Sequence, residues 1–497
     1  MNFSSWIMFP YMAYLGAAVL CLVFWKNTAT QITLSVLAAL VSIFSSMKLL
    51  SLTLKSGVVV HSLGAWGAPF GIVYSVDTLS ALLILCSAWI GLCTLIYSVS
   101  SLNAEYFKQG YCFLFNILLL GVTASFSTGD IFNLYVCFEL LLMSSFVLFS
   151  LGRTRIQLEA CLKYVLINFI GSFFFLLAIA WIYGLFGTLN MAHLAELVRQ
   201  GPLNGPETAA IYMLLICFAL KAAVFPFFSW LPLSYPALPS SLAAVFSALL
   251  TKVGIYALMR LCITIFPLNL ISNAQSLFYI AAVLTMVIGV FGAFAQSSIK
   301  KILSVHIISQ VGYLLLALSL FSEAATTAGI YFLLHLMLTK CNLFLIGGVV
   351  ELETGTDQLN SIGSYASKRP FLALNFIVSA LCLAGIPPLA GFFGKFKLAF
   401  LAAEKSDYLS LIIIFSVSLV TLISMLKIWD QVFWRESETP VLVKHKLLEW
   451  PQYMAIIFIN ISLVIFSLAL PKILPIMDLA SHSLWDSSSY IEKVLSR

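Results

Sequence analysis

The sequence predicts an all-α integral membrane protein of about fourteen transmembrane helices, and three observations indicate this fold class. Of the 497 residues, 61% are hydrophobic and only 9% are charged, whereas soluble proteins have about 25% charged residues. Apolar stretches long enough to cross a hydrocarbon core, about 20 residues each, recur from Tyr11 almost to Leu470. Runs such as 411–426 are uncharged throughout, whereas barrel strands alternate over about ten residues. Helices therefore satisfy the backbone inside lipid.

The expected helices are separated by short polar connections, and we expect the whole chain, 1–497, to form a single transmembrane domain. Residues 471–497 follow the last helix and are expected to be a short C-terminal tail on the outer side. The expected helices span residues 11–25, 31–54, 73–98, 111–128, 131–150, 164–187, 209–229, 240–266, 275–297, 303–322, 327–349, 371–401, 409–434 and 452–470.

The loops differ in charge, and this difference predicts the orientation in the membrane. Residues 1–10 show neither a basic segment nor a small-residue cleavage site, so we expect the first helix to be retained. Loops after even-numbered helices hold little beyond Lys55, Arg199 and Lys405. By the positive-inside rule, the other loops face the cytoplasm and both termini lie outside, as expected for a multi-pass protein of a bacterial cytoplasmic membrane. The loops after odd-numbered helices carry Lys26, Lys108, Arg153, Arg155, Lys300, Lys301, Lys368, Arg369, Arg435, Lys444 and Lys446.

Two expected helices, the seventh and the twelfth, contain residues that interrupt a helix. Pro226 lies inside the seventh helix, and Pro387 and Pro388 follow Gly385 inside the twelfth. A proline removes one backbone donor and clashes with the preceding turn. We therefore expect both helices to be broken within the membrane.

The two broken helices are five helices apart, which predicts an inverted-repeat transporter. The repeats are expected at residues 111–266, helices four to eight, and at residues 275–434, helices nine to thirteen. The match is imperfect, because Lys221 precedes its proline whereas Lys395 follows its proline pair.

Several ionisable side chains are expected deep inside apolar helices. Glu139 lies nine residues after Asp130, which places it near the middle of a core about 30 Å thick. A charge at that depth costs about 2.5 to 3.5 kcal/mol on insertion scales, so such groups are expected to face one another or water. The candidate site residues are Glu139, Lys221, Lys252, Lys340, Lys395, His306 and His335.

These residue types suit proton transfer. Removal from water disfavours the charged form of a lysine, and a nearby carboxylate such as Glu139 favours it. Moving that carboxylate would switch Lys221 between holding and releasing a proton. Histidines titrate near neutrality, so His306 and His335 can carry protons between the lysines. We therefore expect a proton relay in the membrane plane, with water bridging the gaps.

Each candidate also has a structural interpretation. Glu139 can be an ion-pair partner that joins the fifth helix to the seventh. Lys221 can cap carbonyls freed by the helix break, and Lys252 can extend toward an interface. Lys340 and His335 are as compatible with a structural role as with a functional one.

Two further charged groups are expected near the ends of helices, and His306 has an alternative interpretation of the same kind. His306 follows two lysines and can be an interfacial residue. Asp77, at the start of the third helix, and Arg260, late in the eighth, are expected to be boundary charges.

Cofactors, metals and nucleic acid are not expected. The ten cysteines are scattered singly in apolar segments, without a C-x-x-C pair or histidines at metal-ligand spacing, so they are expected to be small core residues. No P-loop, G-x-G-x-x-G or nucleophile elbow is present. The net charge of +6 is explained by orientation in the membrane.

Six stretches together resemble the antiporter-like membrane subunits shared by complex I and the Mrp-type antiporters. The resemblance spans roughly residues 60–435. The stretches are TGDIFNLYVCFEL at 128–140, KAAVFPFFSWLPL at 221–233, SALLTKVGIYALMRL at 247–261, KKILSVHIISQVGYL at 300–314, HLMLTKCNLFLIGGV at 335–349 and AGIPPLAGFFGKFK at 384–397.

Within that superfamily, GAWGAPFGIV at 64–73 and Asp77 resemble the D-type subunits of Mrp multisubunit sodium/proton antiporters. Complex I relatives usually carry a histidine and an acidic residue where this chain has Phe228 and Leu233. Relatives also often carry a second histidine where this chain has Leu336. The long C-terminal extension of the largest complex I pump and of the large A-type Mrp subunit is not expected here.

The resemblance implies a role and partners. Glu139, Lys221, Lys252 and Lys395 take the family's proton-path positions. The implied partners are the large A-type subunit and the small membrane subunits of an Mrp antiporter complex, a hetero-oligomer in the lipid bilayer that exchanges protons for Na⁺, or for K⁺ or Li⁺. Two alternatives stay open: a proton-pumping membrane-arm subunit of complex I or of a membrane-bound hydrogenase, and a scaffold whose charges only join helices.

Overall fold

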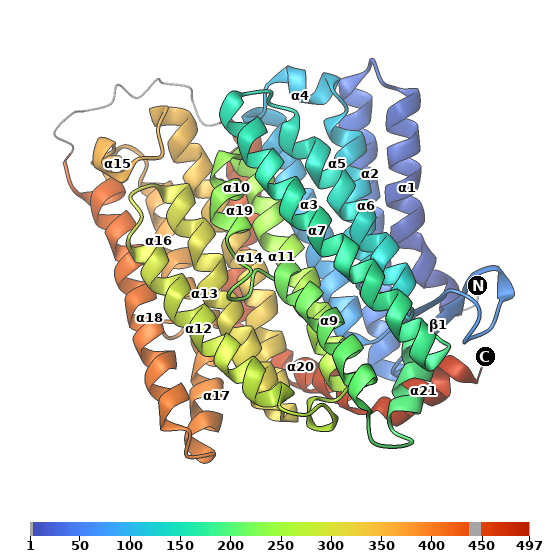
Figure 1. Ribbon diagram of the computed structural model, residues 1–497. Coiled ribbons are helices and arrows are strands. Elements are labelled where there is room, and N and C mark those ends of the chain that lie inside the picture. Colours follow the sequence, from blue (N-terminus) through green and yellow to red (C-terminus); the bar gives the residue numbers. More distant parts are fainter. Residues whose placement is uncertain (1–2, 437–448, 497) are drawn as a thin grey trace.

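The computed structural model describes residues 3–436 and 449–496, and Figure 1 shows them as a bundle of tightly packed helices. Lys444 and Lys446, expected in a basic loop, lie outside the described residues. Fourteen membrane passes in the described ranges correspond to the fourteen expected spans. They are α1 (Met8–Val23), α2 (Thr28–Ser56), α3 (Thr78–Ser101), α5 (Tyr111–Ser125), α6 (Ile131–Ser150), α7 (Arg155–Phe186), α9 (Gly205–Lys221) with α10 (Trp230–Ser234), α11 (Ser240–Met259), α12 (Ala274–Phe294), α13 (Ile299–Ser319), α14 (Glu323–Thr354), α16 (Pro370–Ala384) with α17 (Ala390–Glu404), α18 (Tyr408–Ile428) and α19 (Trp450–Leu468).

Shorter elements connect and extend these passes. Two π-helical turns, η4 (Arg260–Ile265) and η7 (Trp429–Trp434), continue α11 and α18. The other short elements are η1 (Phe3–Ile7), β1 (Val59–Ser62), η2 (Leu63–Ala65), β2 (Val73–Val76), α4 (Ala104–Lys108), α8 (Met191–Val198), η3 (Tyr235–Ala237), η5 (Leu268–Leu270), η6 (Leu359–Ser361), α15 (Tyr365–Lys368), α20 (Leu470–Trp485) and α21 (Ser487–Leu495).

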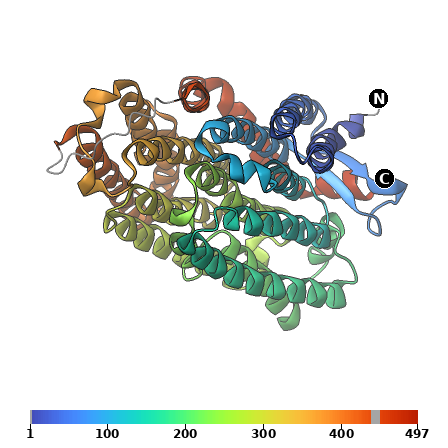
Figure 2. The same cartoon turned by 90° about the horizontal axis from the view of Figure 1, so that it is seen from above.

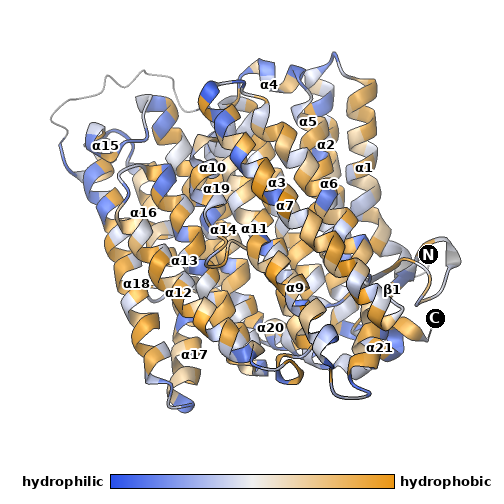
Figure 3. Cartoon of the chain, in the orientation of Figure 1, coloured by the Kyte–Doolittle hydropathy of each residue, from blue (hydrophilic) through white to orange (hydrophobic). Residues whose placement is uncertain are grey.

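Length and composition alone qualify eleven of the described helices as membrane spans. The remaining three passes are the shorter apolar helix α5 and the two interrupted pairs, α9 with α10 and α16 with α17. Figure 3 shows the resulting pattern, in which hydrophobic residues cover the middle of the bundle and hydrophilic residues gather toward its two ends.

Polar caps set where several passes begin. The Asp77 side chain accepts a hydrogen bond from the backbone N–H of Ser80 at the start of α3. Asp130, Thr154 and Ser298 cap α6, α7 and α13 in the same way. Such caps satisfy donors that have no partner within the helix, and each stands immediately before an apolar run.

The buried centre of the bundle consists of α11, α13 and α14, whose most apolar windows lie entirely inside the protein. By contrast, α7, α12 and α18 bury only about a third of theirs and present apolar side chains outward. In the view from above, the blue N-terminal helices lie on one side of this centre and the orange-brown helices on the other, whereas the red C-terminal helices extend back beside the N-terminal ones (Figure 2). The central helices therefore hold their charged side chains away from lipid.

The two chain ends lie at the same end of the bundle, whereas α4 and α15 lie at the opposite end (Figure 1). We call the end with α4 and α15 the basic end, because Lys26, Lys108, Arg153 and Arg369 stand in its connections. The segment 471–497, expected to be a tail, is helical in its described part, and α20 and α21 pack against α14 and α8.

Two boundaries differ clearly from the expected spans. The third span was expected from residue 73, but 73–76 pair with β1 as an antiparallel strand and the helix begins after Asp77. The valines of both strands are β-branched and favour this conformation. The sixth span was expected from residue 164, but α7 begins at Arg155, because Thr154 supplies an N-cap ahead of the apolar run.

Candidate functional site

The structure places all seven candidate residues on membrane-spanning helices and buries six of them. Glu139, on α6, is half-buried. The other six side chains have little or no exposed surface. They lie on α9 (Lys221), α11 (Lys252), α13 (His306), α14 (His335 and Lys340) and α17 (Lys395).

Lys221 is the last residue of α9, immediately before the helix break. Its ammonium donates hydrogen bonds to the backbone carbonyl of Asn168 and the hydroxyl of Ser172, both at 3.1 Å and both on α7. The indole N–H of Trp230 donates to the carbonyl of Leu220 beside the break. The hydrogen bonds of Lys221 therefore join two helices and do not cap its own helix end.

Glu139 lies within electrostatic range of Lys221, but the pair is not among the ion pairs within 4.0 Å in the described ranges. One carboxylate oxygen of Glu139 is buried and has no hydrogen-bond partner among the described residues. A carboxylate close to an ammonium but not joined to it can change its distance without first breaking a hydrogen bond. This geometry suits a movable partner better than a fixed strut.

The next contact along the path joins α9 to α11. A Cβ added to Gly254 would lie 2.9 Å from the backbone nitrogen of Ala222, so the two helices touch backbone to backbone there. Lys252 is two residues before Gly254, and Lys221 directly precedes Ala222. Because both lysines flank this contact, a small shift of the backbone at the α9 break would move Lys221 and Lys252 relative to each other.

Among the described residues, Lys252 and Lys340 donate hydrogen bonds to uncharged acceptors. The Lys252 ammonium donates to the carbonyl of Ser247 at 2.5 Å and to the hydroxyl of Thr251 at 3.2 Å. Lys340 donates to the carbonyl of Leu303 on α13 at 2.9 Å. The two lysines lie within electrostatic range of each other. Like charges at short range in a medium of low dielectric repel strongly, so this arrangement favours having only one of them protonated at a time.

Lys395 caps the first half of the broken twelfth pass. Its ammonium donates to the carbonyls of Leu383 and Ala384, at 2.9 and 3.0 Å, at the C-terminal end of α16. It also lies 4.9 Å from the ring centre of Tyr313. A cation at a helix C-terminus is stabilised by the helix dipole. The capping role considered for Lys221 is therefore seen at Lys395.

The two histidines flank Lys395 from different helices. One ring nitrogen of His335 contacts the carbonyl of Cys382 at 3.2 Å, and one ring nitrogen of His306 contacts the hydroxyl of Ser424 on α18 at 2.8 Å. Both histidines lie within electrostatic range of Lys395. His306 is fully buried, so its interfacial interpretation is wrong.

Sequence reasoning missed a group of polar side chains beside these histidines. Ser309 and Gln310 stand one turn from His306 on α13, and Thr339 stands one turn from His335 on α14. Each has a buried side-chain polar atom without a hydrogen-bond partner in the described part of the chain. Buried polar groups of this kind bind internal water. Polar residues at i, i+3 and i+4 in an otherwise apolar helix were the available signal.

Asp77 and Arg260, which were expected to be boundary charges, stand at the start of α3 and the end of α11 and form a buried ion pair of 2.7 Å. Their side chains are almost fully enclosed, and the guanidinium also contacts the rings of Tyr256 and Tyr490. Tyr490 belongs to α21, so the pair joins the C-terminal helix to α3 and to the end of α11. The sequence did not predict this pairing, because the two residues are far apart in the chain.

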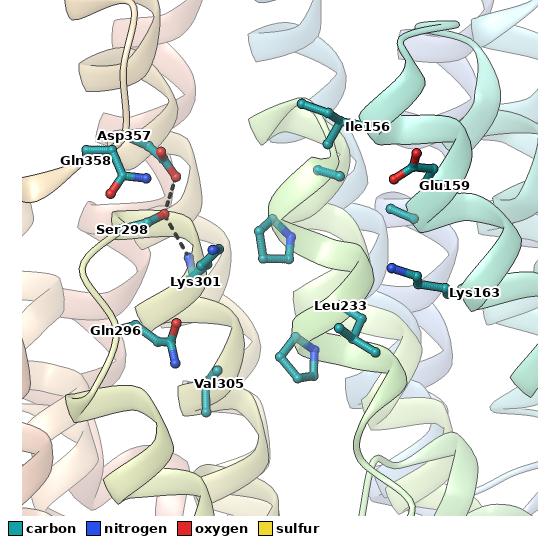
Figure 4. A pocket seen from close by; sticks show the side chains of 14 residues that line it. Ile156, Glu159, Lys163, Leu233, Gln296, Ser298, Lys301, Val305, Asp357 and Gln358 are labelled. Atoms are coloured by element: carbon teal, nitrogen blue, oxygen red, sulfur yellow. Dashed lines mark hydrogen bonds between the residues drawn. The ribbon is translucent and has the colours of Figure 1, made fainter.

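A cavity of about 620 Å³ opens at the basic end between α7, α10 and α13 (Figure 4). Glu159 and Lys163 line one side of it, and Lys301 and Asp357 line the other. None of the seven candidate residues lines this cavity. The described residues also show no group of three or more histidine, cysteine or acidic side chains that could hold a metal.

Comparisons with known proteins identify the family. Residues 128–422 match the family model described as NADH:quinone oxidoreductase/Mrp antiporter, TM. The chain is 37% identical over 492 residues to the D subunit of the Na⁺/H⁺ antiporter of Bacillus subtilis (strain 168), covering 99% of both chains. It is 39% identical over 417 residues to the D subunit of the Na⁺/H⁺ antiporter of Alkalihalophilus pseudofirmus, covering 84% of both. A chain in the structure of the Mrp complex from Dietzia sp. DQ12-45-1b superposes with a TM-score of 0.92 at 28% identity, with full coverage of both chains.

The chain therefore belongs to the NADH:quinone oxidoreductase/Mrp antiporter family of membrane subunits. Within this family it groups with the D subunits of Na⁺/H⁺ antiporters. The fold expected from the sequence is thus confirmed.

Proposed function

We propose that this chain is the D-type, proton-translocating subunit of a multisubunit Na⁺/H⁺ antiporter in a bacterial cell membrane. The similarity to D subunits over almost the whole chain supports this function, and the buried row of ionisable residues supports the proton-translocating role. Its partners are the other Mrp subunits. The membrane-arm subunit of a redox-driven pump is not favoured, because the relatives from Bacillus subtilis and Alkalihalophilus pseudofirmus are antiporter subunits.

The proposed path runs from Glu139 and Lys221 through Lys252 and Lys340 to Lys395, with His306 and His335 beside its far end. Lys221 passes a proton on when Glu139 moves away from it, since the carboxylate favours the charged form of the amine. Because two charged lysines at short range repel each other, protonation of Lys252 or Lys340 favours loss of the proton from the other lysine. The unpartnered polar atoms of Gln310 and Thr339 mark where water can connect the steps.

Two inverted repeats, 111–266 and 275–434, are proposed to support this path. Each contains an interrupted helix, α9 with α10 in the first and α16 with α17 in the second. Each interrupted helix also carries a path lysine beside its break. We further propose that the basic end faces the cytoplasm, so that both termini lie on the outer side.

The arrangement of Lys252, Lys340 and Lys395 supports the proton-translocating role most strongly. These lysines lie close together, and in the described ranges no carboxylate is in ion-pair contact with them. Three permanent charges buried together would be costly, whereas exchangeable protons relieve the repulsion.

The test is transport by inverted vesicles that contain the complete complex, with or without this chain. Cation-dependent proton movement should disappear when the chain is omitted and return when it is restored. Normal exchange without the chain, or loss of quinone-linked pumping instead, would reject the proposal.

A further inference from the structure

An ion pair outside the proposed path lies at the basic end of the central helices. The ammonium of Lys300, at the start of α13, is 2.7 Å from one carboxylate oxygen of Glu351, near the end of α14. Ser240, at the start of α11, donates a hydrogen bond of 3.1 Å to the other oxygen. The Lys300 side chain is only 9% exposed, whereas that of Glu351 is 32% exposed. The carboxylate therefore meets the aqueous phase while its cation faces the protein.

The backbone of Lys300 stands about one helical turn before the residue that Lys340 contacts, whereas Lys340 and Glu351 are eleven residues apart on α14, about 16.5 Å along the helix axis. The ammonium of Lys340 extends to the carbonyl of Leu303 on α13. Leu303 is three residues after Lys300, which corresponds to about 4.5 Å along the helix axis. Lys340 thus reaches toward the basic end.

The surroundings of Glu351 contain few other charges. Lys300 on α13 is its ion-pair partner, and Tyr97 on α3 lies within electrostatic range and donates a hydrogen bond to the carbonyl of Leu345. Glu353, two residues further on, belongs to a separate cluster with Arg369 and Tyr365.

We propose that Glu351 exchanges protons between the aqueous phase at the basic end and Lys340; this rests on the proposed function. When a proton enters the protein from the basic end, a hydronium ion in the aqueous phase transfers it to the Glu351 carboxylate and becomes a water molecule. The carboxylic acid then gives that proton, through bound water, to the neutral amine of Lys340. The carboxylate is regenerated and Lys340 becomes an ammonium, so charge and atoms balance.

The geometry at Gly348 limits where such water can run. A Cβ added to Gly348 would collide with the Cβ of Ser240 and lie 2.7 Å from the Tyr97 hydroxyl. The α11 and α14 helices are therefore in close contact on that side of Glu351. The side toward α13 carries the hydroxyl of Ser304, which donates to the carbonyl of Lys300 at 2.7 Å. We place the transfer along this α13 side.

The test compares two variants that differ only at the carboxylate. Removing Glu351 alone would leave the buried Lys300 with the carbonyl of Leu238 but without its ion-pair partner, so both variants carry Lys300→Met, one alone and one together with Glu351→Gln. Initial rates of cation-driven proton movement are measured in inverted vesicles that contain the whole complex at equal levels of assembly. We expect Lys300→Met to keep most of the exchange, and the double variant to lose at least about tenfold, as is typical for removal of a proton-transfer group.

A conservative variant and two controls complete the test. Lys300→Met with Glu351→Asp should recover part of the lost rate, because a titrating group returns. Asp357→Asn removes a carboxylate from the cavity at the same end and should leave the rate unchanged. Glu139→Gln reports on the proposed path itself.

Equal rates for Lys300→Met with and without Glu351→Gln, beside an inactive Glu139→Gln variant, would overturn the role of Glu351 and leave the proposed function standing. Loss of exchange in Asp357→Asn, with normal exchange in the double variant, would also overturn it and move the aqueous connection to the cavity. Normal exchange in Glu139→Gln would remove the proposed path, and this inference with it.

Discussion

Lys221 has a hydrogen-bond environment that does not require a permanent charge. Both of its acceptors, the Asn168 carbonyl and the Ser172 hydroxyl, are neutral, and Glu139 stays outside ion-pair distance. A neutral amine can keep a donor for either acceptor. Lys221 can therefore give up its proton without losing its place between α7 and α9.

Replacing Lys221 by arginine tests whether that proton has to leave. Arginine keeps the charge and can donate to the same two acceptors, but it stays protonated in a protein. A structural role should survive the change. For a relay residue we expect Lys221→Arg to reduce exchange near to background at normal assembly, measured as dye-reported proton flux over a range of pH. Robust flux throughout that range would make Lys221 a strut.

Glu139→Gln keeps the shape of the side chain and removes the charge that acts on Lys221. Exchange should fall by at least about 100-fold, within the range for loss of a group that controls proton transfer, while the protein stays in the membrane. Glu139→Asp should retain part of the activity. Immunoblots of the membrane fraction control for expression, and wild-type flux in a well-expressed Gln variant would exclude Glu139 from the mechanism.

At this scale the sequence predicted which residues are buried better than it predicted what they touch. Depth within an apolar run was enough to find Lys252, Lys340 and His335. Their partners include backbone carbonyls on neighbouring helices or helix turns, and no pattern along one chain encodes such contacts. The unpartnered Gln310 was missed because a single amide in an apolar helix is also typical of helix packing.

At the scale of the elements, the break between α9 and α10 depends on a close contact with α11. Gly254 lies against the backbone nitrogen of Ala222, so a side chain there would collide with atoms that cannot rotate away. By contrast, Gly184 on α7 has no heavy atom within 4 Å of an added Cβ. The two glycines thus form a matched pair of positions.

Gly254→Ala should push the end of α9 away from α11 and separate Lys221 from Lys252. Overpacking of this kind costs about 1–3 kcal/mol, and we expect a lower melting temperature of the purified complex together with reduced exchange. Gly184→Ala should change neither quantity by much. If both variants behaved like the unmodified protein, the contact at Ala222 would have no part in aligning the path.

Helix breaks were predictable, whereas helix starts and the small hairpin were not. Pro226 and the pair Pro387 and Pro388 each remove a backbone donor and clash with the preceding turn, which kinks or breaks a helix. The start of α7, however, depends on Thr154 as a cap, which an apolar window does not detect. The β1–β2 hairpin follows from pairing across the η2 turn, and the apolar residues of β2 looked like the beginning of a membrane span.

For the whole molecule, the two ends of the bundle differ in their charged groups, and the basic end offers the proposed path a connection to water. The basic end carries Glu351 with Lys300 and the cavity of Figure 4. The opposite end carries the enclosed Asp77–Arg260 pair, held by Tyr490 of the C-terminal helix. Because arginine stays charged and the ion pair is buried, we assign this pair a structural role, in which it joins α3 to the end of α11. The charge asymmetry was readable from the sequence, but this junction depends on residues far apart in the chain.

The orientation of these ends in the membrane follows from the distribution of basic residues and can be measured directly. The ten described cysteines are free, so they are first replaced, and single cysteines are then introduced at Arg155 in the basic end and at Gln200 in the opposite end. Both positions are exposed. By the positive-inside rule the basic end faces the cytoplasm. An impermeant thiol reagent applied to intact cells should therefore label the cysteine at position 200 and not the one at 155, whereas permeabilised cells should show labelling at both. Labelling at 155 in intact cells, with protection at 200, would invert the topology and put the Glu351 carboxylate on the outer side of the membrane.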